Sequence, residues 1–589
     1  MTTRRKSVAV AAFAASAFVL ASCGTAGGGG DEPTDEASAN LADTITIGIE
    51  QTPDAYNANT ADANSVYNTY VDNVTQGSFV QVLPDGTVEH DEEFGTFEKT
   101  SDDPLTVKYT FNDKAVWSDG TPIDFDDALL TWAALSGTHP SGEKAEDGSE
   151  PDLFNAASTN GWAEVEMLQG NAGDKSFTMV FKQPYADWEV LGSGFMPAHI
   201  AAEQAGLSTD DNGAELVKAI QDNDTAKLKK VADFWNTGWA YEADLPSLPD
   251  IALLPASGPY KYDNASNGTL TVVKNDKWWG TPAKTEKLVF KTVNAEEMVQ
   301  ALQNGEIDQF DPSNATADMV SQLEGLGDAV KVEKGESLSF SHVDLDTGKG
   351  GKFEDQRVRQ AFAKCIPRED LVDKFAKPVF DGAQVLRLHE YLPAQAEYED
   401  VLSQVPSAKL YDAVDIDGAK ALLKEAGVKT PYDITFRFAG QSQLRADQVA
   451  LIKASCDQAG FNIKSTPDND VFTTLTHPGE WDAAVFGWAG SGLIASGQSI
   501  YVSKGAQNYG RYSNAKVDEL WDQIVQVTDP ADAVPLKAQM EEQLWSDLYN
   551  ITLYANPGLT AFSSKVTGPA YNPTQYGGTW NAMEWTKSL

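Results

Sequence analysis

The sequence predicts an α/β body, and three observations support this prediction. Strand-like segments, in which apolar and polar residues alternate, are interspersed along the chain with segments that have a helical period. No internal repeat is present, and no Pro-rich linker interrupts the body. We therefore expect domains that share strands, with the chain crossing between them several times.

The expected strands begin directly at the start of the body. In segment 44–50 (TITIGIE) apolar and other residues alternate as in a half-buried strand. A stretch rich in Asn, Asp and Tyr follows over 54–73 and shows no clean period. Four later segments also read as strands, namely 105–112, 176–182, 269–274 and 287–293.

Six helices are expected, most of them in the second half of the chain. The helix at 418–426 has the clearest ends, because Asp417 is expected to be its N-cap and Gly427 is a C-terminal stop signal. The segments with a helical period are 295–304, 355–365, 418–426, 446–459, 515–527 and 533–549.

The first 22 residues have the layout of a signal peptide. A basic start precedes apolar and small residues at 8–21, a run too short to span a bilayer as a helix. The run ends in the tetrapeptide LASC, which resembles the lipobox of bacterial lipoproteins. We expect cleavage before Cys23 and a lipid on its sulfur that anchors the protein to the membrane. The alternative is an ordinary secretory signal with a chance cysteine.

The mature chain then has two unequal parts. Residues 23–43 carry Gly, acidic residues, Pro and Ser, which is typical of a flexible tether. The body from Thr44 to Leu589 is long enough for two to four domains. The formal charge of −43 becomes −46 once Arg4, Arg5 and Lys6 leave with the signal. Because this charge repels nucleic acid and anionic headgroups, we expect no nucleic-acid partner and interpret the charge as a solvated extracellular surface.

Two cysteines remain in the body, Cys365 and Cys456. Each shares a helical face with apolar residues, which indicates buried small side chains. The expected compartment permits a disulfide between them, but the sequence does not establish that they lie close together. Their pairing therefore stays open at this point. No C-x-x-C motif occurs, which excludes thiolate zinc sites and thioredoxin-like chemistry.

Patterns typical of catalysis and metal binding are absent from the sequence. It contains no G-x-S-x-G elbow, no H-E-x-x-H, no P-loop and no Rossmann fingerprint. The six histidines are scattered without ligand spacing. We therefore predict a protein with no metal, no cofactor and no enzymatic activity. Among 87 acidic residues a glycosidase-like carboxylate pair is not excluded, so a secreted hydrolase is kept as an alternative.

Several segments resemble, in order, the motifs of one known family. The segment VWSDGTPIDFDDALLTW (116–132) looks like that family's turn and following helix, in which we expect Trp117 to be a core anchor and Asp124 or Asp126 to cap the helix. This segment and seven others together resemble the family 5 solute-binding proteins of ABC importers, which include oligopeptide- and dipeptide-binding proteins. The chain as a whole resembles an actinobacterial-type lipoprotein of that family. The other seven segments are MPAHI (196–200), SGPYKY (257–262), LTVVKNDKWW (270–279), ALQNGEIDQF (301–310), FEDQRVRQAFAKCIPRED (353–370), AKALLKEAGV (419–428) and ITLYANPG (551–558).

The resemblance implies a particular architecture. It is the two-lobed, periplasmic-binding-protein-like fold of type II, with a hinge-closed cleft and an additional peripheral α/β domain. A cleft between domains is the expected place for a ligand, and hinge closure would link occupancy to shape. Lobe I would be discontinuous, made of 44–78, 255–335 and 546–589, with the peripheral domain at 79–254 and lobe II at 336–545.

The resemblance also indicates ligand-binding residues. In peptide-binding relatives, the segment similar to 481–492 (WDAAVFGWAGSG) carries a Gly-Trp followed by an aspartate that holds the peptide's α-ammonium. Here Trp488 is present, but Ser491 stands in place of the aspartate, which puts free-amine peptides in doubt unless Asp482 or a nearby acid substitutes. Trp488 offers a stacking face and one donor; alternatively it only fills the lobe core. The expected ligand-binding set is Trp488, Ser491, Asn508, Tyr56, Asn57, Tyr501, Tyr509 and His477.

The sequence as a whole predicts an extracytoplasmic, lipid-anchored binding protein. We expect a monomer that captures a peptide or another mid-sized polar solute and passes it to an ABC permease without a cofactor. A neutral aromatic site would suit an uncharged or glycosylated ligand as well as a peptide. The main alternative is a non-transport lipoprotein of the same fold that acts in cell-envelope glycolipid assembly.

Overall fold

The computed structural model describes residues 41–589, except 143, 145–149, 210, 491 and 506. The predicted signal peptide, the lipidation site Cys23 and most of the tether lie outside the described residues, as does Ser491. Leu41–Leu589 form one unit. In the part of the chain that is described, no helix is both long and apolar enough to cross a membrane.

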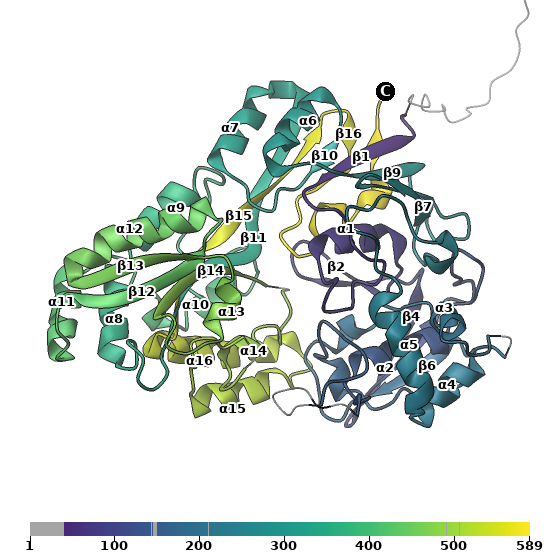
Figure 1. The fold of residues 1–589 in the computed structure, drawn as a ribbon, viewed down its shortest axis with the longest axis horizontal. Helices are drawn as coiled ribbons and strands as arrows, with labels where there is room; N and C mark the ends of the chain where they lie inside the picture. Colours follow the sequence, from purple (N-terminus) through teal and green to yellow (C-terminus); the bar gives the residue numbers. More distant parts are fainter. Residues whose placement is uncertain (1–40, 143, 145–149, 210, 491, 506) are drawn as a thin grey trace, which may run out of the picture. The chain divides into compact units, whose positions relative to one another are not determined.

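One ten-stranded sheet passes through this unit (Figure 1). Its first strand in the chain, β1 (Thr44–Ile49), runs parallel to both of its neighbours, β9 (Lys287–Thr292) and β10 (Gln309–Phe310). From one edge to the other the strands are β13 (Phe461–Asp468), β12 (Tyr432–Ala439), β14 (Ala483–Ala489), β11 (Val330–Leu345), β15 (Asn550–Ser563), β10, β1, β9, β8 (Thr269–Lys274) and β7 (Tyr260–Ser266).

Two long strands, β11 and β15, connect the halves of the sheet. They pair antiparallel from Val330 opposite Ser563 to Asp344 opposite Asn550. One end of the pair packs in an apolar cluster with β10, and the other end packs in a separate cluster with β12 and β14. Between the two clusters the register of the pair shifts, from Glu336 to Phe340. Because such an irregularity lets strands bend locally, the two halves are joined at a point where they can hinge.

All six predicted helices are present, with ends within a few residues of those expected. Segment 295–304 forms a 3-10 turn (Ala295–Glu297) that leads into α6 (Met298–Asn304). The N-cap of α11 is Asp415, which accepts a hydrogen bond from the Gly418 amide at 2.8 Å, so the prediction of Asp417 was wrong because the chain is already helical at Ile416. The other helices are α8 (Gln356–Cys365), α11 (Ile416–Glu425), α12 (Gln443–Ala459), α15 (Ala515–Ile524) and α16 (Pro530–Asp547).

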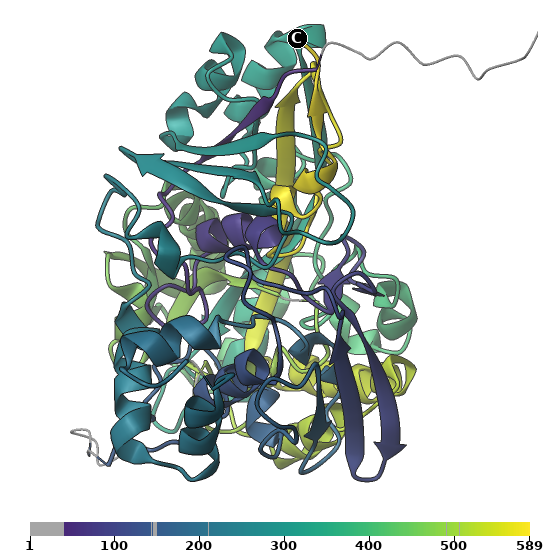
Figure 2. The same ribbon diagram turned by 90° about the vertical axis from the view of Figure 1, so that its right-hand side faces the viewer.

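Residues between the first strands and β7 add a smaller α/β part, whose blue helices and strands gather together in Figure 2. Trp117 is a buried core residue, as predicted, and Asp124 caps α2 in a capping box with Asp127. The core of this smaller α/β part is continuous with the core under β1, β8 and β9. The elements are a hairpin of β2 (Val80–Val82) and β3 (Val88–His90), a sheet of β4 (Gly95–Asp102), β5 (Leu105–Phe111) and β6 (Ser176–Val180), and helices α2 (Phe125–Leu135), α3 (Ala198–Gln204), α4 (Ala214–Gln221) and α5 (Thr225–Thr237).

The structure resolves the open question of the two cysteines. Cys365 at the end of α8 and Cys456 in α12 form a disulfide, with their Cα atoms 4.9 Å apart. Both side chains are fully buried, as the sequence predicted. The bond joins helices that are 91 residues apart in the chain. It therefore closes a long loop within the half of the sheet that contains β12 and β14.

Replacing both cysteines by Ala is expected to lower the free energy of unfolding by about 2–4 kcal/mol, because the cross-link restricts the unfolded chain. The measurement is urea unfolding of the wild type and the double variant, each with and without dithiothreitol. The reductant is expected to shift the wild type toward the double variant and to leave the double variant unchanged. Equal unfolding midpoints for the two oxidised proteins would contradict this expectation.

Candidate ligand-binding site

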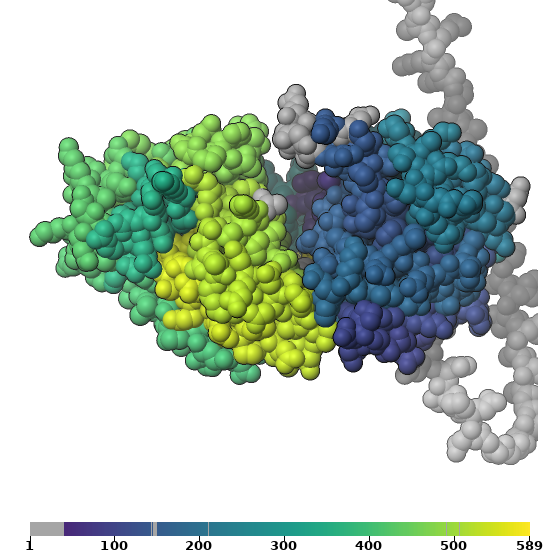
Figure 3. Space-filling model, turned by 90° about the horizontal axis from the view of Figure 1, so that it is seen from below, coloured from purple at the N-terminus to yellow at the C-terminus, as the bar shows by residue number. Residues whose placement is uncertain are grey.

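A cavity of about 580 Å³ opens between segments that are far apart in the sequence. Its walls come from Tyr56 and the loop after β1, from α1 (Val66–Thr75), from the β2–β3 hairpin, from residues 190–196 and from the C-terminal residues 576–584. Figure 3 shows a different feature, a recess between the blue and the yellow-green parts of this unit, whereas the described lining of the cavity includes no residue of the yellow-green part. A cavity of this volume, built from several segments, is large enough for a small ligand.

One face of α1 lines the cavity. Thr69, Asp72, Asn73 and Gln76 follow one another at helical spacing and all contribute to the wall. The opposite face of the helix, with Val71 and Val74, is buried in the core. Ser65 caps the helix by accepting a hydrogen bond from the Asn68 amide. The helix thus holds a row of polar side chains against the cavity.

Asp72 is the most unusual group in this wall. Its side chain is partly exposed to the cavity but otherwise surrounded by protein, and among the described residues no hydrogen-bond or ion-pair partner contacts its carboxyl group. This burial raises the pKa of Asp72 to about 8. Burial, and to a smaller extent the charge of Asp72, also raises the pKa of Tyr262 beside it. An ionised Asp72 would be better accommodated if a positive charge lay beside it.

The rest of the cavity is acidic and aromatic. No Lys or Arg occurs among the described residues that line it. Such a wall concentrates negative potential in a space of low dielectric, which favours cations over anions. The acidic side chains are Asp72, Glu89, Asp91, Glu93 and Glu584; the large apolar ones are Tyr56, Phe195, Met196, Trp278, Tyr576, Trp580 and Met583.

Trp488 stands at the other predicted part of the site, near the end of β14. Its ring lies nearly parallel to those of His342, at a centroid distance of 5.8 Å and 9°, and of Tyr509, at 6.0 Å and 14°. The indole N–H is buried and has no hydrogen-bond partner among the described residues. Phe486 contacts the same ring edge-on at 5.1 Å. Trp488 therefore packs within its lobe and keeps one unused donor.

Three other predicted site residues, Tyr56, Asn57 and Asn508, donate hydrogen bonds to backbone carbonyl groups. Tyr56 lines the cavity, but its hydroxyl donates to the Pro255 carbonyl at 2.5 Å. Asn57 is buried and donates to the Trp235 carbonyl at 2.9 Å. Asn508 donates to two carbonyl oxygens, those of residues 502 and 512, each at 2.8 Å.

The two remaining described candidates lie in different surroundings. Tyr501 is fully buried, and its ring is stacked on Trp521. His477 is exposed just after α13 (Val471–Leu475) and contacts the Thr473 carbonyl at 2.8 Å. The structure thus brings Trp488 and Tyr509 together and places Tyr56 in the cavity wall. A ligand-binding role for these residues and for the other candidates stays a prediction.

A short segment of the peripheral part contacts the half of the unit that carries Trp488. Asp187 accepts hydrogen bonds from the Ile494 amide at 2.9 Å and from the Ala495 amide at 2.8 Å. Next to it, the Ala186 amide donates to the Val525 carbonyl at 2.8 Å. Asp187 is 7% exposed, and burial raises the pKa of its carboxyl group even though the two amides lower it. These bonds join two parts that the hinge strands would otherwise allow to separate.

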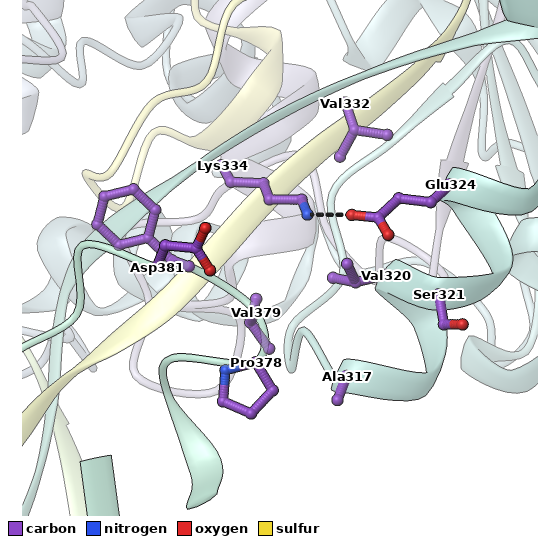
Figure 4. A pocket seen from close by; sticks show the side chains of 10 residues that line it. Ala317, Val320, Ser321, Glu324, Val332, Lys334, Pro378, Val379 and Asp381 are labelled. Carbon is purple, nitrogen blue, oxygen red and sulfur yellow. Dashed lines mark hydrogen bonds and ion pairs between the residues drawn. The ribbon is translucent and has the colours of Figure 1, made fainter. Parts of the chain in front are cut away.

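A second cavity of about 610 Å³ lies beside the hinge strands (Figure 4). One wall is α7 (Ala317–Gly325) and the other is the segment 378–381, with Lys334 of β11 between them. Lys334 forms an ion pair with Glu324 at 3.0 Å. Val379 of the segment 378–381 packs in the same apolar cluster as Val320 of α7. In the described part of the chain, no group of His, Cys, Asp and Glu side chains is placed to hold a metal ion.

The sequence interpretation missed Asp72 and the face of α1 to which it belongs. Segment 54–73 seemed to lack a period because its apolar residues are few. The spacing of Val71 and Val74 against the polar positions 69, 72, 73 and 76 was the available signal. Polar residues on one side of a helix usually contact bulk water, but on α1 they line a cavity. The sequence alone does not distinguish a solvent-exposed polar surface from one that lines a cavity.

The fold and the cavity define a class of protein, the type II solute-binding proteins with mixed α/β lobes. The family model for bacterial extracellular solute-binding proteins, family 5, matches residues 92–510. The chain belongs to this family.

Two relatives match most of the chain. An uncharacterized lipoprotein of Mycobacterium tuberculosis is 25% identical over 517 residues, which cover 85% of this chain and 86% of that protein. The oligopeptide-binding protein OppA of the same species is 24% identical over 490 residues, or 82% of this chain and 74% of that protein. A probable monoacyl phosphatidylinositol tetramannoside-binding protein, LpqW, also of M. tuberculosis, is 22% identical over 210 residues, which cover 35% of this chain and 25% of that protein.

Solved structures share the fold. The periplasmic EDTA-binding protein EppA aligns with a TM-score of 0.80 at 22% identity and covers 94% of this chain and 98% of its own. The oligopeptide-binding protein AppA of Bacillus subtilis, solved with a nonapeptide, aligns with a TM-score of 0.68 at 17% identity over 94% of this chain and 100% of its own. None of the relatives named here is described as an enzyme.

Proposed function

We propose that this protein is the solute receptor of an ABC importer, held outside the cell membrane by a lipid on Cys23. It binds a peptide or a similar mid-sized polar solute in its cleft and delivers it to a membrane permease. The observation that carries this proposal is the pair of long strands with an irregular register between two apolar clusters, together with a cavity of about 580 Å³, in a chain of family 5. The tether before Thr44 would let the body reach the permease without diffusing away.

Hinge closure would couple ligand binding to delivery. Lobe I, the peripheral domain and lobe II, as divided in the sequence interpretation, would move about the irregular stretch of β11 near Glu336. A ligand drives such a change only when it binds the closed form better than the open form. Contacts such as those of Asp187 with the amides of residues 494 and 495 would be made only in the closed form.

A second candidate is a role in cell-envelope glycolipid assembly. It is favoured by the partial similarity to LpqW, a probable monoacyl phosphatidylinositol tetramannoside-binding protein. The acidic lining of the cavity opposes it, because carboxylates such as Glu89 and Glu93 would repel a lipid phosphate. The peptide-like solute is therefore the better-supported ligand.

Native mass spectrometry of gently purified protein tests the proposal. We expect a bound species of a few hundred daltons that is released by mild unfolding and is not a lipid. Recovery of a phosphoglycolipid would replace the importer by the second candidate. Conversion of the bound species during incubation would contradict a binding protein altogether.

Replacing Trp488 by Ala is expected to weaken binding of the retained species about 10-fold, since a stacking contact is worth roughly 1 kcal/mol or more. The affinity is measured by isothermal titration calorimetry. Trp488→Phe is the matched control and is expected to retain most of the affinity. If the Ala variant binds as tightly as the wild type while folding normally, Trp488 serves only to pack the lobe.

A further inference from the structure

We propose that the cavity against α1 selects ligands with a cationic nitrogen, an ammonium or a guanidinium, and that the Asp72 carboxylate is the group that holds it. This inference rests on the proposed function and names the chemistry of its ligand. It starts from a carboxyl group that lines a cavity of about 580 Å³ and has no partner among the described residues. Buried carboxylates are ordinarily paired, so an unpaired one that faces an open space is suited to a charge that arrives with a ligand.

Further polar groups lie around Asp72. The side-chain nitrogen of Gln76, one helical turn further along the same face of α1, is buried and has no hydrogen-bond partner among the described residues. The hydroxyl groups of Tyr241 and Tyr262 are also buried near Asp72, whose charge contributes to raising the pKa values of both. A ligand with an ammonium beside a carbonyl or hydroxyl oxygen could satisfy both Asp72 and the Gln76 donor.

The charge of the wall agrees with this reading. Four further acids, Glu89, Asp91, Glu93 and Glu584, line the same cavity, with His90 between them. Since the described lining contains no basic residue other than this histidine, nothing there compensates the acids. The aromatic rings of Trp278 and Trp580 in the wall also attract cations through their faces. An anionic solute would meet repulsion from the acids at 89–93 and at 584.

The protonation of Asp72 gives the proposal a pH signature. Its pKa of about 8 means that in the empty protein most of these carboxyl groups are protonated at pH 7. A bound cation favours the carboxylate, so binding releases a proton. The affinity for a Lys-bearing ligand should therefore rise up to about tenfold per pH unit below 8 and level off above it. The titratable groups facing Asp72 are Tyr56, Tyr241 and Tyr262, which stay neutral in this range because burial raises their pKa values.

The test uses three mixtures of tetrapeptides with acetylated and amidated ends. They are randomised over Ala, Ser, Leu and Tyr, and every peptide also carries one Lys, one Gln or one Glu, depending on the mixture. Spermidine is a fourth probe, which separates a peptide from a simple polyamine. Calorimetry is carried out on the stripped full-length protein at pH 6, 7, 8 and 9. We expect the Lys mixture to bind at least 10-fold more tightly than the Gln and Glu mixtures, and more tightly at pH 8 than at pH 6.

The variant Asp72→Asn keeps the shape of the side chain and is expected to abolish the preference for Lys and its pH dependence. Because it removes an unpaired buried acid, it should also leave the melting temperature unchanged or raised, whereas a purely structural role would lower it. Asp233→Asn, the same change at an exposed position of α5, is the matched control and should behave as the wild type.

The outcomes separate the two proposals. If the Gln or Glu mixture binds as tightly as the Lys mixture, or if the Asp72→Asn variant keeps the preference for Lys, the cation site is contradicted while the solute receptor stands. If spermidine alone binds, and does so through Asp72, the cation site stands and the peptide is replaced by a polyamine. If no probe binds the wild type at any of the four pH values, the cation site is contradicted, while the solute receptor is judged by the species that the purified protein retains.

Discussion

Replacing Asp187 by Ala is expected to weaken ligand binding by up to about 100-fold. The carboxylate accepts two amide hydrogen bonds, from Ile494 at 2.9 Å and from Ala495 at 2.8 Å, that join the peripheral part to the lobe of Trp488. A hydrogen bond to a charged group contributes roughly 1.5–3 kcal/mol. In an open form these amides would bond to water, so the loss falls on the closed form alone. The apparent affinity then drops in proportion to the closed fraction.

Calorimetry with the retained ligand measures this effect, and small-angle X-ray scattering reports the accompanying opening. Asp187→Asn keeps one acceptor of similar shape and is expected to lose less than the Ala variant. The neighbouring bond from the Ala186 amide to Val525 is made by the backbone and persists in both variants. An Ala variant that binds and scatters like the wild type would show that the contact does not hold the closed form.

Replacing Glu541 by Ala is expected to lower the free energy of unfolding by about 3–5 kcal/mol, as is usual when one member of a buried ionic network is removed. Glu541 in α16 is fully buried, and one carboxylate oxygen accepts from the amides of His389 at 2.6 Å and Glu390 at 2.8 Å. The other oxygen lies 2.6 Å from the His389 ring. Its loss would leave the His389 and Glu390 amides and the His389 ring without this partner. Glu390 in the same network also forms an ion pair with Lys537.

Urea unfolding monitored by tryptophan fluorescence measures this loss. Glu541→Gln can still accept from both amides, so it is expected to retain a substantial part of the stability. A Gln variant as unstable as the Ala variant would indicate that the charge of Glu541 beside His389, rather than the hydrogen bonds from the two amides, stabilises this network. An Ala variant as stable as the wild type would contradict a stabilising role for this network.

The strands and helices that could be predicted from the sequence are those with a strong period. The five expected strands and six expected helices all occur, because their apolar residues face one or another of the apolar cores. The two long strands β11 and β15 were harder to predict from the sequence. β11, for example, carries charged or polar residues at Lys331, Glu333 and Ser339. Such a strand lacks a continuous apolar face, although it joins the two halves. The disulfide depended on the approach of α8 and α12, which no local pattern encodes.

The candidate site was predicted in part. The Gly-Trp resemblance led to Trp488, and the structure adds Tyr509 and His342 as its stacking partners. Asn57 and Asn508 were inferred from the family resemblance, but an Asn side chain can equally satisfy backbone carbonyls. Asp72 was missed because burial without a partner is a property of the folded surroundings, which the residue type alone does not reveal.

Small-angle X-ray scattering of the protein, stripped of ligand and then reloaded with the retained species, tests the central claim most directly. A solute receptor of the proposed kind closes about β11 and β15 when its cavity is filled. We therefore expect reloading to lower the radius of gyration, and Asp187→Ala to reduce this change. Identical scattering curves for the stripped protein and the protein saturated with its ligand would contradict closure about these strands.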